Sequence, residues 1–202
     1  MDGQDYLNQI SATVRPEKKS KMSFMSSTIF KVIAGAVVAF ILIAVFGAII
    51  NGGKAGARDQ AIALKLNLDG VLEVISEYQP SVKSSNLRSS SASLYSILSN
   101  TNRELENNIT ETYKYNPKSD DKKFEETTAL ERDGLDSALF EAKINGILDQ
   151  VYANKMAYTV SLIMSKESSL YNATSNEDLQ KILSSSYNSL DTLYSQFSDF
   201  QK

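Results

Sequence analysis

The sequence predicts an all-α protein, with one N-terminal transmembrane helix followed by an antiparallel, up-down bundle of about four long helices. Three observations carry this prediction. One long stretch near the N-terminus contains no charged side chain, and beyond it apolar residues recur every three or four positions. Only two prolines, Pro80 and Pro117, follow the apolar stretch, so few positions interrupt a helix.

The apolar run begins at Val32 and ends at Ile50, and its nineteen residues include no polar side chain. An α-helix rises about 1.5 Å per residue, so a helix of this length crosses the hydrocarbon core of a bilayer, which is about 30 Å thick. We therefore expect residues 32–50 to insert into the membrane.

The flanking charges predict which side of the membrane each part occupies. Five basic residues precede the run, whereas Lys54, Arg58 and Lys65 are the basic residues within about 20 positions after it. This bias predicts that residues 1–31 are a basic cytoplasmic leader. The chain is then a single-pass protein of the cell membrane, and its C-terminal domain lies outside the cytoplasm. The reverse orientation stays open. The five leader residues are Arg15, Lys18, Lys19, Lys21 and Lys31.

A cleaved signal peptide is the alternative to a retained anchor. Ala55, Gly56 and Ala57 have the small residues that signal peptidase favours, but the run exceeds the usual 7–15 residues of a signal peptide and charged Lys54 precedes the site. A retained signal anchor is therefore the better interpretation. The three glycines within residues 51–56 predict a flexible hinge, and a flexible hinge favours a tether over rigid transmission through the membrane.

Self-association is a second open question. Small residues four apart within the run, Gly35 with Ala39 and Ala44 with Ala48, let two membrane helices approach closely. The apolar pattern of the later helices also suits an intermolecular coiled coil, although its seams are thin and contain serines. Packing within one chain is preferred, and a homo-oligomer stays possible.

Residues 57–202 form the predicted extracytoplasmic bundle, and its first and last helices show the clearest periodicity. The first runs from residue 57 to 79 and ends at Pro80, and the last starts with Ser175 as N-cap and two acids in its first turn. The periodic positions are Ala61, Leu64, Leu68, Val71, Ile75 and Tyr78 in the first, and Leu179, Leu183, Ser186, Leu190, Leu193, Phe197 and Phe200 in the last.

The second helix is predicted from about residue 87 to 115, followed by a loop at residues 116–121. Its stripe is thinner and includes polar positions. The stripe consists of Leu87, Ser91, Leu94, Leu98, Thr101, Leu105, Ile109 and Thr112. Serines are mediocre helix formers, so packing must hold this segment.

The third segment is predicted from about residue 121 to 171, with a pause at Asp133 and Gly134 and a kink at Asn145 and Gly146. Its expected buried stripe is Phe140, Ile144, Ile147, Leu148, Val151, Tyr158 and Leu162. Its most apolar part, residues 156–164, is too short to cross a bilayer. With four antiparallel helices, the hinge and the C-terminus lie near the same end.

Composition excludes several functions. The chain has no cysteine and no histidine, which removes disulfides, thiolate metal sites and the commonest general base. The net charge is −3, and residues 54–202 are the acidic part, with sixteen basic residues against twenty-one acidic ones. We therefore expect no nucleic-acid binding.

The densest acidic cluster is Asp120, Asp121, Glu125 and Glu126. Paired carboxylates serve glycoside hydrolysis or bind hard metals. Here lysines interleave with the acids and the cluster lies near a helix start, which favours a solvated face. The S-x-x-K spacing of Ser119 and Lys122 has no partner motif. We predict no catalytic, cofactor-binding or metal-binding residue.

Six tyrosines at helical spacing are candidates for a binding groove, although such tyrosines more often lie at the edge of a core. They are Tyr78, Tyr95, Tyr152, Tyr158, Tyr187 and Tyr194.

Two resemblances accompany these patterns. The segment DYLNQIS at residues 5–11, with Arg15 and Pro16 before the lysines and the span, resembles uncharacterised single-pass proteins of Saccharibacteria-type episymbiotic bacteria. The similarity covers about the first fifty residues. The overall layout resembles the LemA family of bacterial membrane proteins in architecture only. Neither resemblance includes a functional motif, so neither implies an activity.

The sequence therefore predicts a membrane-anchored extracytoplasmic helical bundle that binds or scaffolds a protein partner and has no catalytic activity. The alternative is a single-pass sensor or accessory subunit that signals through a partner chain. An extracytoplasmic hydrolase is the weakest alternative, because no pair of acids falls on an apolar stripe where burial would raise a pKa.

Overall fold

The computed structural model describes residues 56–201, and these belong to one compact unit that spans Gly53–Lys202. The predicted leader, the transmembrane run from Val32 to Ile50 and nearly all of the hinge lie outside the described residues. Among the described helices, none combines the length and apolar character needed to span a bilayer. The described part is all-α, as predicted, and contains no strand.

Five long α-helices make up this part, one more than the four predicted. They are α3 (Ala57–Tyr78), α4 (Ser85–Tyr113), α5 (Pro117–Ile144), α6 (Leu148–Ala173) and α7 (Glu177–Ser198). Two short 3₁₀ helices, η1 (Gln79–Ser81) and η2 (Asp199–Gln201), follow α3 and α7. Pro80 lies in η1, which confirms the predicted end of the first helix.

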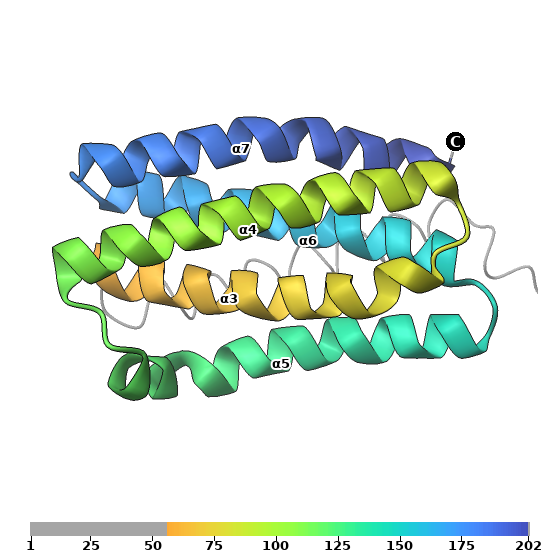
Figure 1. The fold of residues 1–202 in the computed structure, drawn as a ribbon, viewed down its shortest axis with the longest axis horizontal. Helices are drawn as coiled ribbons and strands as arrows, with labels where there is room; N and C mark the ends of the chain where they lie inside the picture. The colour runs from red at the N-terminus through yellow and green to blue at the C-terminus, as the bar shows by residue number, and fades with distance from the viewer. Residues whose placement is uncertain (1–55, 202) are drawn as a thin grey trace, which may run out of the picture. The chain divides into compact units, whose positions relative to one another are not determined.

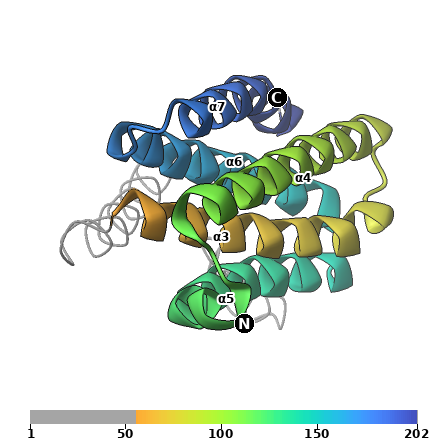
Figure 2. The same ribbon diagram turned by 60° about the vertical axis from the view of Figure 1, so that its left-hand side comes forward.

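Four of the helices form a closed ring, and α5 lies outside it. Around the ring, α3 packs on α4, α4 on α7, α7 on α6, and α6 on α3. Successive helices run up and down, so all ring neighbours are antiparallel, whereas α5 packs parallel to α3 and antiparallel to α6 (Figure 1). Seen from the side, α4 and α5 lie on opposite sides of α3 (Figure 2). The architecture is a four-helix ring with a fifth helix packed on one edge.

The additional helix changes where the chain ends. With an odd number of alternating helices, the start of α3 and the end of α7 lie at opposite ends of the bundle (Figure 1). The prediction that the hinge and the C-terminus share one end is therefore wrong. The cause is the predicted third segment, which is two helices rather than one.

The break between α5 and α6 is a helix stop at Gly146 rather than a kink. Gly146 has a φ of +71°, which glycine adopts at little cost. Its N–H donates to the Lys143 carbonyl at 3.2 Å, and the Ile147 N–H donates to the Ala142 carbonyl at 3.0 Å. This pair of bonds is the Schellman motif that ends helices. The predicted pause at Asp133 and Gly134 is also wrong, because both residues lie inside α5.

Two helix starts differ from the predicted ones for local reasons. Residues 116–121 are not a loop: Asn116 caps α5 by accepting from the Lys118 N–H, and Pro117 takes the first helical position, where its missing N–H costs nothing. The N-cap of α7 is Asn176 rather than Ser175, and its side chain accepts from the N–H groups of Asp178 and Leu179.

The core confirms three of the four predicted stripes. Every periodic position named for the first helix is buried, as are those of the second except exposed Thr112 and those of the last except exposed Phe200. The third stripe is mostly wrong, since Phe140, Ile144, Ile147 and Tyr158 are exposed, although Leu148 is buried as predicted and Val151 and Leu162 are partly buried. The buried residues of α6 are Leu148, Tyr152, Ala153, Met156, Thr159, Val160, Ile163, Met164, Glu167 and Leu170.

Candidate functional site

The predicted acidic cluster is a set of structural contacts at the start of α5. Asp120 accepts from the Arg58 guanidinium at 2.8 Å and from the Asn116 N–H at 2.8 Å. The Arg58 hydrogen bond, followed by the Asn116 one, holds the pKa of the Asp120 carboxyl below its usual range. Asp121 accepts from the Tyr115 hydroxyl at 2.6 Å.

These contacts leave the cluster without the geometry of a catalytic or metal site. Glu125 and Glu126 are exposed on α5. The Ser119 hydroxyl donates to the Asn116 carbonyl at 3.3 Å, as helix-start serines do, rather than meeting the Lys122 amine as a nucleophile meets its base. Within the described residues, no group of three or more acidic side chains is placed to hold a metal ion.

The six candidate tyrosines divide into two groups. Tyr78 and Tyr152 are buried: the Tyr78 hydroxyl donates to Asp136 at 2.9 Å, and the Tyr152 hydroxyl is hydrogen-bonded to Ser91 across the ring. The others are about two-fifths exposed. The exposed group consists of Tyr95, Tyr158, Tyr187 and Tyr194. Only Tyr187 of these lines the hollow described next, so the structure does not assemble the six into one groove.

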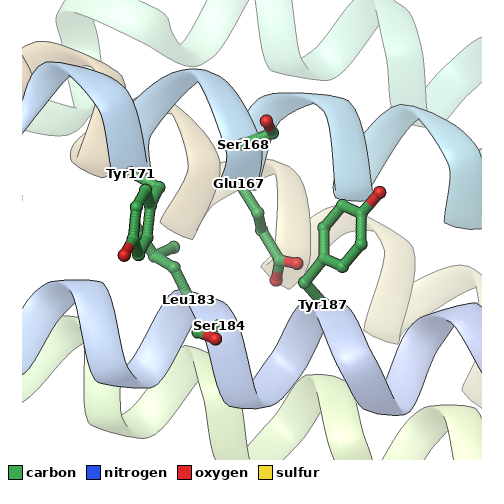
Figure 3. Close-up of a pocket in the computed structure, with 6 residues that line it drawn as sticks. All are labelled: Glu167, Ser168, Tyr171, Leu183, Ser184 and Tyr187. Carbon is green, nitrogen blue, oxygen red and sulfur yellow. The ribbon is translucent and has the colours of Figure 1, made fainter.

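A hollow of about 200 Å³ lies between α6 and α7. It is lined by Glu167, Ser168 and Tyr171 from α6 and by Leu183, Ser184 and Tyr187 from α7. Figure 3 shows the Glu167 carboxyl directed toward α7, with a tyrosine ring on either side along the two helices. One acidic and two aromatic side chains therefore line this cavity.

Glu167 is the unusual group of this hollow. Its side chain is 1% exposed, and neither carboxyl oxygen has a hydrogen-bond partner among the described residues. Burial raises the pKa of Glu167 to about 7, and the neighbouring Ser186 hydroxyl partly offsets the rise. Ser186 Oγ makes no hydrogen bond of good geometry either, so two buried polar groups of α6 and α7 face each other incompletely satisfied.

Sequence reasoning missed Glu167 because it looked for pairs of acids. The available signal was the apolar period of α6, in which Val160, Ile163, Glu167 and Leu170 follow at steps of three and four. Because Glu167 takes a position of this apolar series, its side chain is expected to be buried with the others. The predicted third stripe starts at Phe140 in α5 and continues into α6. The turn between the two helices changes the direction in which successive side chains point, so this stripe does not follow the buried positions of α6.

A second candidate surface is the C-terminal end of α5. Phe140 and Ile144 are one helical turn apart and Ile147 follows in the turn, and the three side chains are between 50% and 68% exposed. We call these three residues the α5 face. Because α5 runs parallel to α3, this face lies at the end of the bundle away from Ala57 (Figure 1). Three large apolar side chains gathered within eight residues mark a candidate interaction surface.

Comparison with known proteins adds no family to these observations. No protein-family model matches the chain, and neither the curated proteins nor the solved structures contain a significant match.

Proposed function

We propose that this chain is a membrane-tethered binding module, without catalytic activity, whose helical bundle holds a protein partner outside the cytoplasm. The tether is the apolar run from Val32 to Ile50. The observation that carries the binding part is the α5 face, which presents three large apolar side chains at the end of the bundle opposite the start of α3.

The partner that fits this face is a protein segment with an apolar helical ridge. Phe140 and Ile144 follow one another along a helix at the spacing through which two helices pack side by side. The ring of α3, α4, α6 and α7 closes without α5, so the outer side of α5 is available to a second helix without exposing the ring's core.

The tether is tested by extraction with alkaline carbonate. The full chain is expected to stay in the membrane pellet, because nineteen apolar residues insert with a favourable free energy of several kcal/mol. Release into the supernatant contradicts the anchor.

The binding face is tested by photo-crosslinking in intact cells, with a photoreactive phenylalanine at position 140 of the full chain. We expect an adduct with one protein at position 140 and none with the same group at exposed position 194 on α7. The substitution Ile144→Asp places a charge in the face and should abolish the adduct. An adduct of equal yield at both positions, or one insensitive to Ile144→Asp, contradicts the proposal.

A further inference from the structure

The hollow between α6 and α7 contains a buried acidic side chain that has no part in the proposed function. Its charged lining residue is Glu167, whose carboxyl oxygens are covered by protein and have no hydrogen-bond partner of good geometry among residues 56–201. An ionised carboxylate in this position is costly, because burial removes its hydration and the neighbouring Ser186 hydroxyl offsets that loss only in part. A cation that enters the hollow removes this cost by pairing with the carboxylate.

The two tyrosines supply the second half of such a site. Tyr171 is 41% exposed and Tyr187 is 39% exposed, and Figure 3 shows their rings on either side of the Glu167 carboxyl. The face of an aromatic ring attracts a positive charge within about 6 Å. Because both rings reach the surface, a ligand from solvent meets them before it reaches the covered carboxyl.

The size and lining of the hollow restrict the ligand. A volume of about 200 Å³ is below the range of roughly 300–1,000 Å³ that holds drug-sized ligands, so it suits a single small group. At pH values above about 7, where Glu167 is ionised, an anion would be repelled and a neutral group would leave the carboxylate unpaired. Ca²⁺ and Mg²⁺ need about six or more oxygen ligands, and no acidic group among the described residues provides them.

We propose that this hollow binds the ammonium group of an alkylamine, which pairs with Glu167 between the rings of Tyr171 and Tyr187. The ammonium group belongs either to a free small amine or to a lysine side chain, which offers the same chemistry. The site lies on α6 and α7 and is independent of the α5 face, so it stands or falls separately from the proposed function.

The first test is ligand-observed NMR on the full chain in detergent, with n-butylammonium as probe and n-butanol as its uncharged counterpart. We expect saturable binding of n-butylammonium and none of n-butanol at the same concentration. Equal binding of the two, or no saturable binding of n-butylammonium, overturns the proposal, because the hollow would then not select for charge.

Three variants locate the site. Glu167→Gln keeps the shape of the side chain and should weaken n-butylammonium binding about tenfold or more, because a charge-assisted hydrogen bond is lost. Tyr187→Leu should weaken it several-fold, whereas Tyr194→Leu is the matched control, two turns further along α7 and equally exposed at 40%. Unchanged binding by Glu167→Gln, with an unaltered circular dichroism spectrum, overturns the proposal.

The source of the ammonium group is distinguished by a second probe, Nα-acetyl-lysine methylamide. Tighter binding of this probe than of n-butylammonium supports a lysine side chain of a protein, and the reverse order supports a free amine. Binding of both with equal sensitivity to Tyr194→Leu and Tyr187→Leu overturns the assignment to this hollow.

Discussion

The helices α7 and α5 are both amphipathic, yet the contacts that hold them to the bundle differ. In α7, Leu179, Leu183, Leu190, Leu193 and Phe197 are buried between α4 and α6. In α5 only Leu135, Leu139 and Ala142 are buried, all in its C-terminal half. The N-terminal half of α5 packs Phe124, which is partly buried, against the core and otherwise makes charged and polar contacts to its neighbours.

Those polar contacts are specific. Arg58 pairs with Asp120 at 2.8 Å and Lys123 pairs with Asp59 at 2.6 Å, which joins the starts of α3 and α5. Further along, one oxygen of Glu131 accepts from Asn67 and from Lys166, each at 2.6 Å. Exposed ion pairs stabilise by at most about 1 kcal/mol each, whereas a buried leucine contributes several-fold more. The difference indicates that α7 is part of the core and α5 is a peripheral helix.

The largest expected change in stability comes from replacing one buried leucine in each helix by alanine. Leu190→Ala in α7 should lower the free energy of unfolding by about 3 kcal/mol, because it leaves a cavity in the ring. Leu135→Ala in α5 should cost about half as much, since its site is at the rim. Urea unfolding of the full chain in detergent, followed by circular dichroism, measures both. A larger loss for Leu135→Ala would contradict the peripheral position of α5.

The next effect concerns the buried acid of α6. Folding raises the pKa of Glu167 from 4.5 to about 7, so its ionisation destabilises the fold increasingly as pH rises through this interval. Glu167→Gln removes that penalty and should stabilise the protein at pH 8 by up to about 3 kcal/mol, and by less than about 1 kcal/mol at pH 5.

The measurement is the unfolding free energy of both proteins at the two pH values, in phosphate buffer without amines. Glu125→Gln is the matched control, because Glu125 is an exposed residue of α5, and it should change the unfolding free energy only slightly at both pH values. A Glu167→Gln gain that is the same at pH 5 and pH 8 would show that the carboxyl does not titrate in this interval.

A smaller effect is expected at the polar contacts of α5. Glu131→Ala leaves Asn67 and Lys166 without their shared acceptor, and both are largely buried, so we expect a loss of about 1–2 kcal/mol. Added salt should reduce the difference only partly, because the pair is shielded from solvent. The unfolding free energy at low and high salt measures it, and no loss at either would contradict the role of Glu131.

The smallest effect is local. Asp120→Asn weakens the pair with Arg58 and should loosen the first turns of α5 without altering α7. Because the pKa of Asp120 is lowered by that pair, its contribution is present at neutral pH and is lost as pH falls through the lowered value. Amide hydrogen exchange of residues 118–124 should be faster in the variant at pH 7. Faster exchange throughout α7 would instead indicate a global effect.

The comparison also explains what the sequence could predict. The α3, α4 and α7 stripes were recognised because each helix keeps one phase from end to end and buries it. The third stripe failed because Gly146 resets the phase, so Phe140 and Ile144 were counted with residues of α6 that face elsewhere. The start of α5 was missed because Asn116 and Pro117 are a helix-start signal that also resembles a loop.

The candidate sites were less predictable than the fold. A lone acid in an apolar series, Glu167, is visible in the sequence only after α6 has been separated from α5. Tyr171 and Tyr187 come from different helices, and their meeting depends on how α6 and α7 pack, which no local pattern encodes. The predicted membrane run and its orientation concern residues 1–55 and stay predictions.

The most direct test of a tethered bundle that docks a partner through α5 uses the absence of cysteine from the chain. Single cysteines at exposed positions 126 and 144 are labelled with a membrane-impermeant maleimide, in intact cells and in the purified full chain. We expect Glu126→Cys to react in both preparations. The labelling rate of Ile144→Cys, divided by that of Glu126→Cys, should be several-fold lower in cells than in the purified chain. Equal relative rates would contradict docking on the α5 face, and labelling of Glu126→Cys only after permeabilisation would contradict an extracytoplasmic bundle.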